Sequence, residues 1–251
     1  MPSPFYIQGL KLVYALEDLD KIHGRVADLG CGAGNMAKAL KRHRADLEVF
    51  GVDISKRAIS EARKNPGGVK FRLGSLEKLP FKEGSLDAVT MFDVLEHVSD
   101  PQRALGEVRR VLKKGGIFHL FLPLDKQPGT LYHLLYKIGW QPKNKHTGHI
   151  VVFSDKEALE LFKKSGLKLI KKRFSFHYFF SIFDILFFTF LELFDISAPA
   201  SIEGMIEEKK NNPLVFLFNL FYRAIVALGN LESKVLSIIP GGGGHYLLAK
   251  G

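Results

Sequence analysis

Three glycines at alternate positions, Gly30, Gly32 and Gly34, carry the residue spacing with the clearest chemical meaning in this chain. They follow a short apolar run, and a helix is predicted after them over about 36–43. Glycine adopts positive φ angles easily and lets a ligand approach bare main chain. The positive end of the following helix faces the same turn. This combination predicts a site for a nucleoside that carries a carboxylate or a phosphate.

A second candidate ligand group lies at the end of the next apolar run. Residues 48–53 are predicted to form a strand that ends in the carboxylate of Asp53. An acid about 20 residues beyond a glycine turn is placed to accept hydrogen bonds from both hydroxyls of a ribose. A dinucleotide fingerprint would need a third glycine at position 35, where this chain has Asn35. The spacing therefore argues against a nicotinamide-dependent dehydrogenase.

The elements that must position these residues alternate between strands and helices. Ser55 is a predicted N-cap for a helix over 56–64, and Pro101 is predicted to open another helix that closes at Gly115 and Gly116. Such alternation favours a parallel, doubly wound α/β sheet. Strands are predicted over 26–29, 48–53, 69–73, 86–92, 117–122 and 167–174.

Composition limits the class of protein further. The 251 residues suit one domain with elaborations, and the single cysteine, Cys31, excludes an internal disulfide. Residues 1–173 hold 31 Lys and Arg against 19 Asp and Glu, so this part would attract nucleic acid or an anionic membrane. The start of the chain has no apolar signal region, so we expect a cytoplasmic protein.

Five segments of the chain form a recognisable series, namely D-x-G-x-G-x-G from Asp28, Gly74–Phe81, Leu86–Val89, Val94–Val98 and Val111–Gly116. In their order and spacing they resemble the class I S-adenosylmethionine-dependent methyltransferases, in particular the methyltransferase type 11 and ubiquinone-biosynthesis O-methyltransferase groups. The resemblance implies a Rossmann-like, doubly wound seven-stranded sheet with its last strand antiparallel. It also implies S-adenosyl-L-methionine (SAM) as the cofactor.

The resemblance also implies which residues contact the cofactor. Members of the family often have an acid at the position of Ser75, where it holds the adenine amino group, and a serine hydroxyl would accept that hydrogen bond more weakly. Cys31 is expected to fill space beside the ligand. The implied contacts are Asp28, Gly30, Cys31, Gly32, Gly34, Asp53, Ile54, Ser75, Leu76, Phe92 and Asp93.

Three ionisable residues, Asp93, Glu96 and His97, are predicted to lie beside the transferable methyl group. His97 is the candidate catalytic base, because its unperturbed pKa lies near neutrality. Alternatively, Glu96 and His97 pair and hold the loop. The three residues also resemble a run that is associated with a magnesium-type ion in the ubiquinone O-methyltransferases. Similar runs are widespread in methyltransferases without metal, so no metal is assigned.

Residues 125–152 are predicted to form an acceptor-binding lid at the carboxyl edge of the sheet. The histidines His133, His146 and His149 in this lid match no standard zinc spacing. We therefore expect them to contact the acceptor or to pack the loop.

An apolar helical insertion is predicted over 176–240, before a last strand within 241–251. Residues 174–221 hold 12 of the 21 phenylalanines. Asp184 interrupts the first apolar run, which makes a true membrane span costly, by about 2.5–3.5 kcal/mol. Helices lying in the membrane interface fit better, and basic residues over 163–173 precede them. The alternatives are a buried cap, a homodimer face or a span.

The sequence therefore predicts a SAM-binding methyltransferase domain over 1–175 and 241–251, with the apolar insertion between them. The predicted activity is methyl transfer to a small apolar or lipid-linked acceptor, with peripheral membrane association. Two alternatives stay open. One is an RNA methyltransferase, which the basic residues favour although no RNA-binding motif is visible. The other is a non-catalytic, membrane-associated subunit that binds the cofactor.

Overall fold

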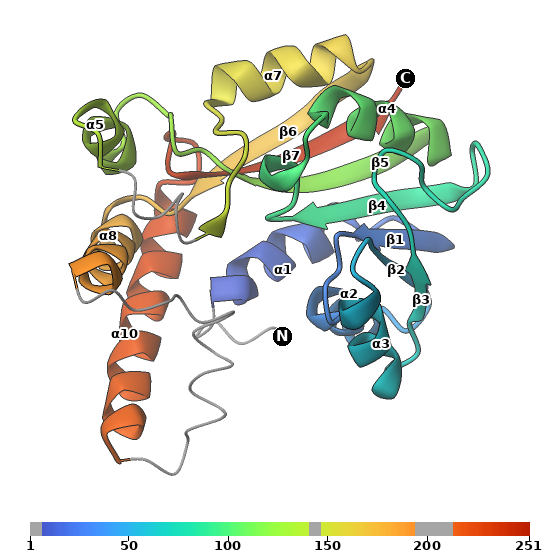
Figure 1. Ribbon diagram of the computed structural model, residues 1–251. Coiled ribbons are helices and arrows are strands. Elements are labelled where there is room, and N and C mark those ends of the chain that lie inside the picture. Colours follow the sequence, from blue (N-terminus) through green and yellow to red (C-terminus); the bar gives the residue numbers. More distant parts are fainter. Residues whose placement is uncertain (1–6, 141–146, 194–212) are drawn as a thin grey trace.

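A computed structural model gives the structure of the protein and describes residues 7–140, 147–193 and 213–251. Within these residues, seven strands form one sheet in the order β3-β2-β1-β4-β5-β7-β6 (Figure 1). β7 runs antiparallel to both of its neighbours, and the other paired strands are parallel. The predicted fold class is confirmed. The strands are β1 Arg25–Leu29, β2 Glu48–Asp53, β3 Lys70–Leu73, β4 Leu86–Phe92, β5 Leu112–Pro123, β6 Leu167–Ser175 and β7 Gly243–Lys250.

Helices cover both faces of this sheet. In Figure 1, α4 and α7 lie over one face, and α1, α2 and α3 lie against the other. Each layer has its own apolar core, because one cluster joins the sheet to α4 and α7 and a second joins it to the other three helices. The helices are α1 Ile7–Asp18, α2 Asn35–His43, α3 Lys56–Lys64, α4 Pro101–Val111, α5 Leu131–Lys137, α7 Asp155–Lys164, α8 Tyr178–Leu193 and α10 Pro213–Val235, with a 3₁₀ turn η1 at Leu95–His97.

Local capping signals set the starts of three helices. The Ser55 hydroxyl accepts from the Ala58 amide at 3.2 Å and begins α3. Asp100 caps α4 in the same manner, with Pro at the first helical position. Ser154 makes a reciprocal capping box at α7. Because these bonds satisfy amides that the helix itself leaves unpaired, short sequence patterns predicted the starts of α3 and α4 correctly.

The predicted end of α4 is wrong. The helix ends at Val111 and β5 begins at Leu112, whereas the sequence predicted a helix to Gly115 and Gly116 and a strand from Ile117. Gly115 has φ +73°, and a Cβ on Gly116 would lie 3.1 Å from the Asp87 carbonyl oxygen. The two glycines therefore permit an irregular start of a strand beside β4, where the pairing register shifts.

The apolar insertion leaves and re-enters the sheet at one point, because Ser175 at the end of β6 pairs with Gly243 at the start of β7. Its helices α8 and α10 pack on each other around Phe180, Tyr222 and Val226. In Figure 1 they lie to the left of the sheet, on the side where the arrow of β4 ends. Among the described helices, none has the length and apolar content that a membrane crossing requires.

Candidate cofactor and acceptor site

A pocket of about 330 Å³ opens at the carboxyl ends of the parallel strands. Six residues that the sequence predicted as cofactor contacts line it, together with His97: Gly30, Asp53, Ile54, Ser75, Leu76 and Asp93. The other predicted contacts, Asp28, Cys31, Gly32, Gly34 and Phe92, lie around the pocket but are not among the residues that line it. The topology thus brings the ends of β1, β2, β3 and β4 to one cavity.

Asp53 is held at the pocket by backbone amides. Its Oδ2 atom accepts from the Gly32 amide at 2.8 Å, and its Oδ1 atom accepts from the Ser55 amide at 2.8 Å. Because each carboxylate oxygen has two lone pairs, the group can still accept from a vicinal diol. Ile54 follows with a side chain that is 73% exposed, so an apolar surface adjoins the carboxylate. These groups suit a ribose and a planar base.

The three glycines of the turn differ in whether their surroundings would accept a side chain. An added Cβ on Gly30 would lie 2.4 Å from the Val94 side chain, and one on Gly34 would lie 2.4 Å from the Phe71 ring. The fold itself therefore requires both glycines. At Gly32 (φ +52°), an added Cβ would meet no described atom within 4 Å. The backbone of Gly32 thus faces open space, in which a ligand can lie against the main chain.

Asp28 lies beneath the glycine turn. Its side chain accepts from the Thr90 hydroxyl at 2.9 Å, and the residue is 2% exposed. Burial raises the pKa of this carboxyl to about 7, against the hydrogen bonds from Thr90 and from the Ala37 backbone. The position indicates that Asp28 supports the turn and the start of α2. Its direct contact with a cofactor stays a prediction.

The Asp28 pKa predicts how stability depends on pH. Between the unfolded pKa near 3.8 and the folded pKa near 7, the folded protein binds the proton more tightly, so this carboxyl destabilises the fold as pH rises. The slope approaches about 1.4 kcal/mol per pH unit. We expect the difference in Tm, Asp28→Asn minus wild type, to become more positive from pH 4 to 7 and then to level off. Thermal unfolding of both proteins measures this. A constant difference would contradict the assigned ionisation.

Cys31 and Phe92 have packing roles. Burial raises the pKa of the Cys31 thiol, so the thiol stays protonated at neutral pH. Its Sγ lies against the Gly51 backbone, since a Cβ added there would be 2.9 Å away. Phe92 is 8% exposed and packs on the His119 ring, with 5.5 Å between centroids. The described contacts therefore fit space-filling next to the pocket, as the sequence predicted for Cys31.

Asp93 follows β4 in a left-handed conformation (φ +53°) and forms an ion pair with Lys11 of α1. Lys11 is buried, and its ammonium lies 4.0 Å from the centroid of the Phe121 ring. Lys11 was not among the site residues predicted from the sequence. In the sequence, Lys11 stands out only as a charged residue inside the apolar run 10–13. A cation that is buried in this way requires a partner. The ion pair fixes α1 over the end of β4.

Glu77 is a second pocket residue that the sequence analysis missed. Its carboxylate accepts from the Ser99 hydroxyl at 3.2 Å, and its amide donates to the Ser75 hydroxyl at 3.2 Å. The chain therefore places a carboxylate in the pocket two residues after the position where the family often has one. The predicted adenine contact of Ser75 stays a prediction.

His97 has a defined tautomer. Its Nδ1 lies 3.1 Å from the Gly148 carbonyl oxygen, which only accepts, so Nδ1 carries the proton and Nε2 keeps a lone pair. Burial lowers the pKa of this imidazole, which favours the neutral form. His97 Nε2 lies 3.9 Å from Glu96 Oε1, beyond hydrogen-bond distance. Both predicted roles, a base and a partner of Glu96, remain compatible with this geometry.

Glu96 is the most unusual group at the site. The residue is 1% exposed, and neither carboxylate oxygen has a hydrogen-bond partner among the described residues. Burial, and then the charge of Asp93, raise its pKa to about 8. Its backbone carbonyl accepts from the amides of Ile150 and Val151 at 2.9 and 3.0 Å, which attaches the lid segment to the turn η1.

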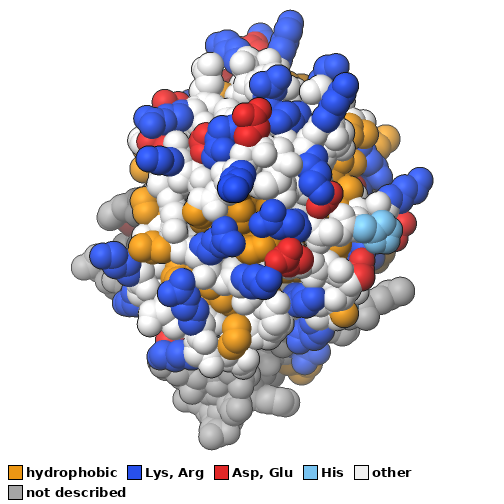
Figure 2. All heavy atoms as spheres, turned by 90° about the vertical axis from the view of Figure 1, so that its right-hand side faces the viewer, with side chains coloured by type: hydrophobic (Ala, Val, Ile, Leu, Met, Phe, Trp, Pro, Cys, Tyr) orange, Lys and Arg blue, Asp and Glu red, His pale blue; other side chains and the backbone are white. Residues whose placement is uncertain are grey.

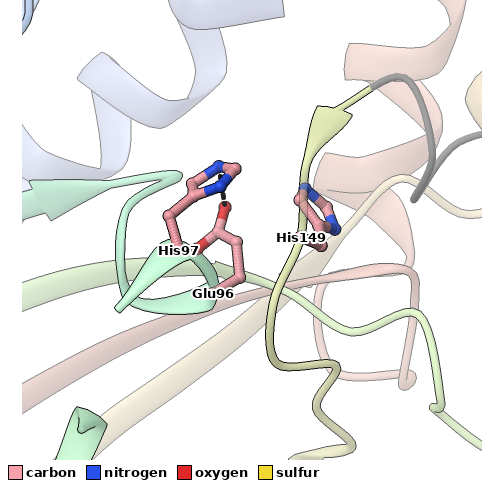
Figure 3. Close-up of side chains that lie close together, drawn as sticks. All are labelled: Glu96, His97 and His149. Atoms are coloured by element: carbon pink, nitrogen blue, oxygen red, sulfur yellow. Dashed lines mark ion pairs between the residues drawn. The ribbon is translucent and has the colours of Figure 1, made fainter. Parts of the chain in front are cut away.

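The segment that carries His149, part of the predicted lid, lies beside this pair (Figure 3). The rings of His97 and His149 meet edge to face, with 5.2 Å between centroids. Ligand atoms of Glu96, His97 and His149 lie within 4.8 Å of one another. Asp93, predicted as a third member with Glu96 and His97, pairs with Lys11 instead. Of the other lid histidines, His133 lies in α5 and His146 lies outside the described residues.

The fold and the pocket together define a class, namely Rossmann-like proteins that bind a nucleoside at the carboxyl edge of a sheet. A family profile described as "Methyltransferase domain" matches residues 27–120. In a solved structure from Thermotoga maritima, titled a SAM-dependent methyltransferase and possible histamine N-methyltransferase, 31% of aligned residues are identical. The alignment covers 66% of this chain and 73% of that one, with a TM-score of 0.53. The chain therefore belongs to the SAM-dependent methyltransferases, whose cofactor is S-adenosylmethionine.

Two curated relatives are similar over shorter regions. A demethylmenaquinone methyltransferase of Thermotoga maritima is 37% identical over 122 residues, which cover 47% of this chain and 53% of the relative. A ubiquinone biosynthesis O-methyltransferase of Alkalilimnicola ehrlichii is 35% identical over 150 residues, covering 56% and 60%. The chain thus spans less than two thirds of the length of either relative.

Proposed function

We propose that this protein transfers the methyl group of SAM to a small apolar or lipid-linked acceptor at a membrane surface. When bound, SAM supplies an electrophilic methyl group on a sulfonium. The observation that carries the proposal is the outward apolar surface of the insertion, which is attached to the lid of the pocket. The names of the two curated relatives, one for demethylmenaquinone and one for ubiquinone biosynthesis, support a quinone-related acceptor.

Helix α8 turns an unbroken apolar stripe outward. Its members recur every three or four residues, which places them on one face of a helix. They are all between 49% and 76% exposed. This α8 stripe consists of Phe179, Ile182, Leu186, Phe190 and Leu193.

Helix α10 carries a matching stripe over its described side chains, formed by Phe221, Leu228, Leu231 and Val235, each at least 50% exposed. The two helices pack on each other through the buried residues Phe180, Tyr222 and Val226, and a polar contact joins the start of α8 to α10. There, Glu232 of α10 accepts from the amides of Tyr178 and Phe179 at 3.1 Å each. An amphipathic helix pair with apolar side chains on its outer face fits a position in the plane of a membrane interface.

The lid is attached directly to α8. The Tyr132 hydroxyl of α5 donates to Asp184, and Trp140 Nε1 donates to the Thr189 hydroxyl at 3.1 Å. Asp184 therefore has a partner on the protein and does not belong to the outward stripe. The helix that we propose to meet lipid thus supports the predicted lid, whose Gly148 carbonyl contacts His97 of the pocket.

The support from charge is weaker than the sequence indicated. In the predicted basic run before the insertion, Arg173 is buried and pairs with Asp18, and Lys172 pairs with Asp155. Figure 2 shows Lys and Arg side chains spread over the side that faces right in Figure 1, while α8 and α10 lie on the left. The membrane proposal therefore rests on apolar contact.

The same basic side favours RNA as the second candidate acceptor. The pocket, however, lies at the carboxyl ends of the strands, and the arrow of β4 points away from the basic side. Several of the cations are also paired, such as Lys113 with Asp87 and Lys70 with Glu48. RNA bound there would lie far from the transferable methyl group.

For an oxygen acceptor, His97 is the candidate base in the metal-free protein. It lines the pocket, and its Nε2 lone pair can receive the hydroxyl proton. The remaining work of the chain is to align the acceptor and to exclude water, which the lid and α1 would do from two sides.

The proposal is tested by incubating the protein with radiolabelled SAM and liposomes that contain a prenylated catechol or a demethylmenaquinone. We expect label in the lipid fraction. One matched reaction contains a soluble polar catechol without liposomes, and a second contains total RNA. Label in the polar catechol or the RNA alone would overturn the acceptor class. Binding of S-adenosylhomocysteine with no transfer to any acceptor would indicate a non-catalytic subunit.

A further inference from the structure

The potential ligand atoms of Glu96, His97 and His149 lie close together. The contacts of the fold given above do not explain this arrangement. Glu96 and His97 come from the turn after β4, and His149 comes from the lid, about 50 residues later in the chain. Figure 3 shows the two segments beside each other, with Glu96 and His97 on the turn and His149 on the segment opposite. One ligand atom from each lies within 4.8 Å of the other two.

Both imidazoles are held with Nδ1 engaged. His149 Nδ1 lies 3.0 Å from Asp125 Oδ2, and both side chains are at least 94% buried, with exposures of 5% and 6%. The carboxylate accepts, so Nδ1 of His149 donates and its Nε2 is the nitrogen that keeps a lone pair. The Gly148 carbonyl fixes His97 in the same tautomer. A carboxylate or carbonyl behind a ligating histidine is the usual second partner in metal sites.

Glu96 gives an independent reason to expect a ligand. A buried carboxyl group without a hydrogen bond costs free energy whether it is protonated or charged, and buried groups of this kind are normally hydrogen-bonded, paired or bound to a metal. Lys11 is a buried cation that could neutralise Glu96, but it already forms an ion pair with Asp93. Neither oxygen of Glu96 has a hydrogen-bond partner among the described residues, and Oε1 lies 3.9 Å from His97 Nε2.

We propose that Glu96, His97 and His149 bind a zinc ion between the turn after β4 and the lid. Two imidazoles and one carboxylate form a donor set of catalytic zinc sites, whereas magnesium prefers oxygen ligands and water. The ligand set differs from the one that the family resemblance predicted, because it omits Asp93 and adds a residue of the lid. Asp125 is a positioning residue that acts through His149.

The ion would hold the lid against the edge of the sheet. A tetrahedral zinc ion keeps its ligand atoms about 3.3 Å apart, from Zn–N and Zn–O distances near 2.0–2.1 Å. Side-chain rotations would bring the three groups from their present separation to that distance. His97 lines the pocket, so the fourth zinc position would lie next to the acceptor. When bound, zinc would occupy the His97 Nε2 lone pair and would lower the pKa of an acceptor hydroxyl, so His97 would then act as a ligand and not as the base.

The test is metal content and affinity in the full chain after treatment with a chelator. We expect one zinc ion per chain after dialysis against zinc, a rise in Tm with zinc, and little response to magnesium. His149→Ala should lose the bound zinc, and Asp125→Asn should weaken its binding by about 10-fold or more. Cobalt in place of zinc should give the visible absorption of a four-coordinate ion, absent in His149→Ala.

His43→Ala is the matched control, because this histidine lies exposed in the last turn of α2 and should leave zinc content unchanged. Wild-type protein that retains no zinc, or His149→Ala and Glu96→Gln proteins that both fold and bind zinc as wild type does, would overturn the proposal. S-adenosylhomocysteine binding, measured separately, distinguishes this result from a failure of the proposed methyl transfer.

Discussion

Replacing Asp53 with alanine is expected to lower the affinity for S-adenosylhomocysteine by at least ~100-fold. Hydrogen bonds to a charged group contribute about 1.5–3 kcal/mol each, and a ribose diol would make two of them. The pocket also loses the carboxylate that holds the Gly32 amide. Calorimetric titration measures the affinity, with NADH as the control ligand. The affinity of Asp53→Asn, which keeps one acceptor oxygen, should lie between those of wild type and Asp53→Ala.

Glu61→Ala provides the matched control for this experiment. Glu61 lies on α3 with an exposed side chain and forms an ion pair with Lys64, away from the pocket. We expect its affinity to equal that of wild type. A folded Asp53→Ala protein that binds S-adenosylhomocysteine as tightly as wild type would show that Asp53 does not hold the ribose. Tight binding of NADH by wild type would contradict the cofactor itself.

Replacing Leu186 and Phe190 with glutamate is expected to abolish binding to liposomes. Burial of one large apolar side chain contributes about 1.5–3 kcal/mol, so losing two lowers the partition coefficient by at least ~100-fold, before the cost of placing two charges at an interface. Both side chains lie in the α8 stripe, 65% and 51% exposed, so the fold should tolerate the change. Flotation with vesicles of neutral and anionic lipid measures the partition.

Ile170→Glu is the control, since Ile170 is 57% exposed on β6 and lies outside the two apolar stripes. The Ile170→Glu protein should float with liposomes as wild type does. If wild type does not float and instead forms a dimer that the double variant dissociates, the stripe is a subunit interface and the membrane proposal fails. Light scattering of both proteins detects that outcome.

The parts of the site that local sequence determines could be predicted. The glycine turn, the strand ending in Asp53 and the helix starts at Ser55 and Pro101 are set by local sequence patterns, so the pattern and the structure agree. The glycines at 115 and 116 misled the prediction, because glycine permits an irregular strand as readily as it ends a helix.

The parts of the site that depend on tertiary contacts could not be predicted. Lys11 meets Asp93 across 82 residues, and Glu96 meets His149, which lies about 50 residues later in the predicted lid. No spacing rule connects such positions. Asp125 was visible only as the first residue of a predicted loop, and its role emerges from one contact with His149. The sequence therefore predicted the cofactor side more completely than the acceptor side.

The direct pairing of Ser175 with Gly243 has a consequence for how proteins of this kind can diversify. The insertion begins and ends at one closed hairpin, so its length can change without altering the register of any strand. Lengthening a loop costs little, about 0.6 kcal/mol for each doubling. The insertion can therefore be exchanged or shortened, or its sequence can adapt to new acceptors. The part of the sheet that binds the nucleoside can keep its structure during such changes.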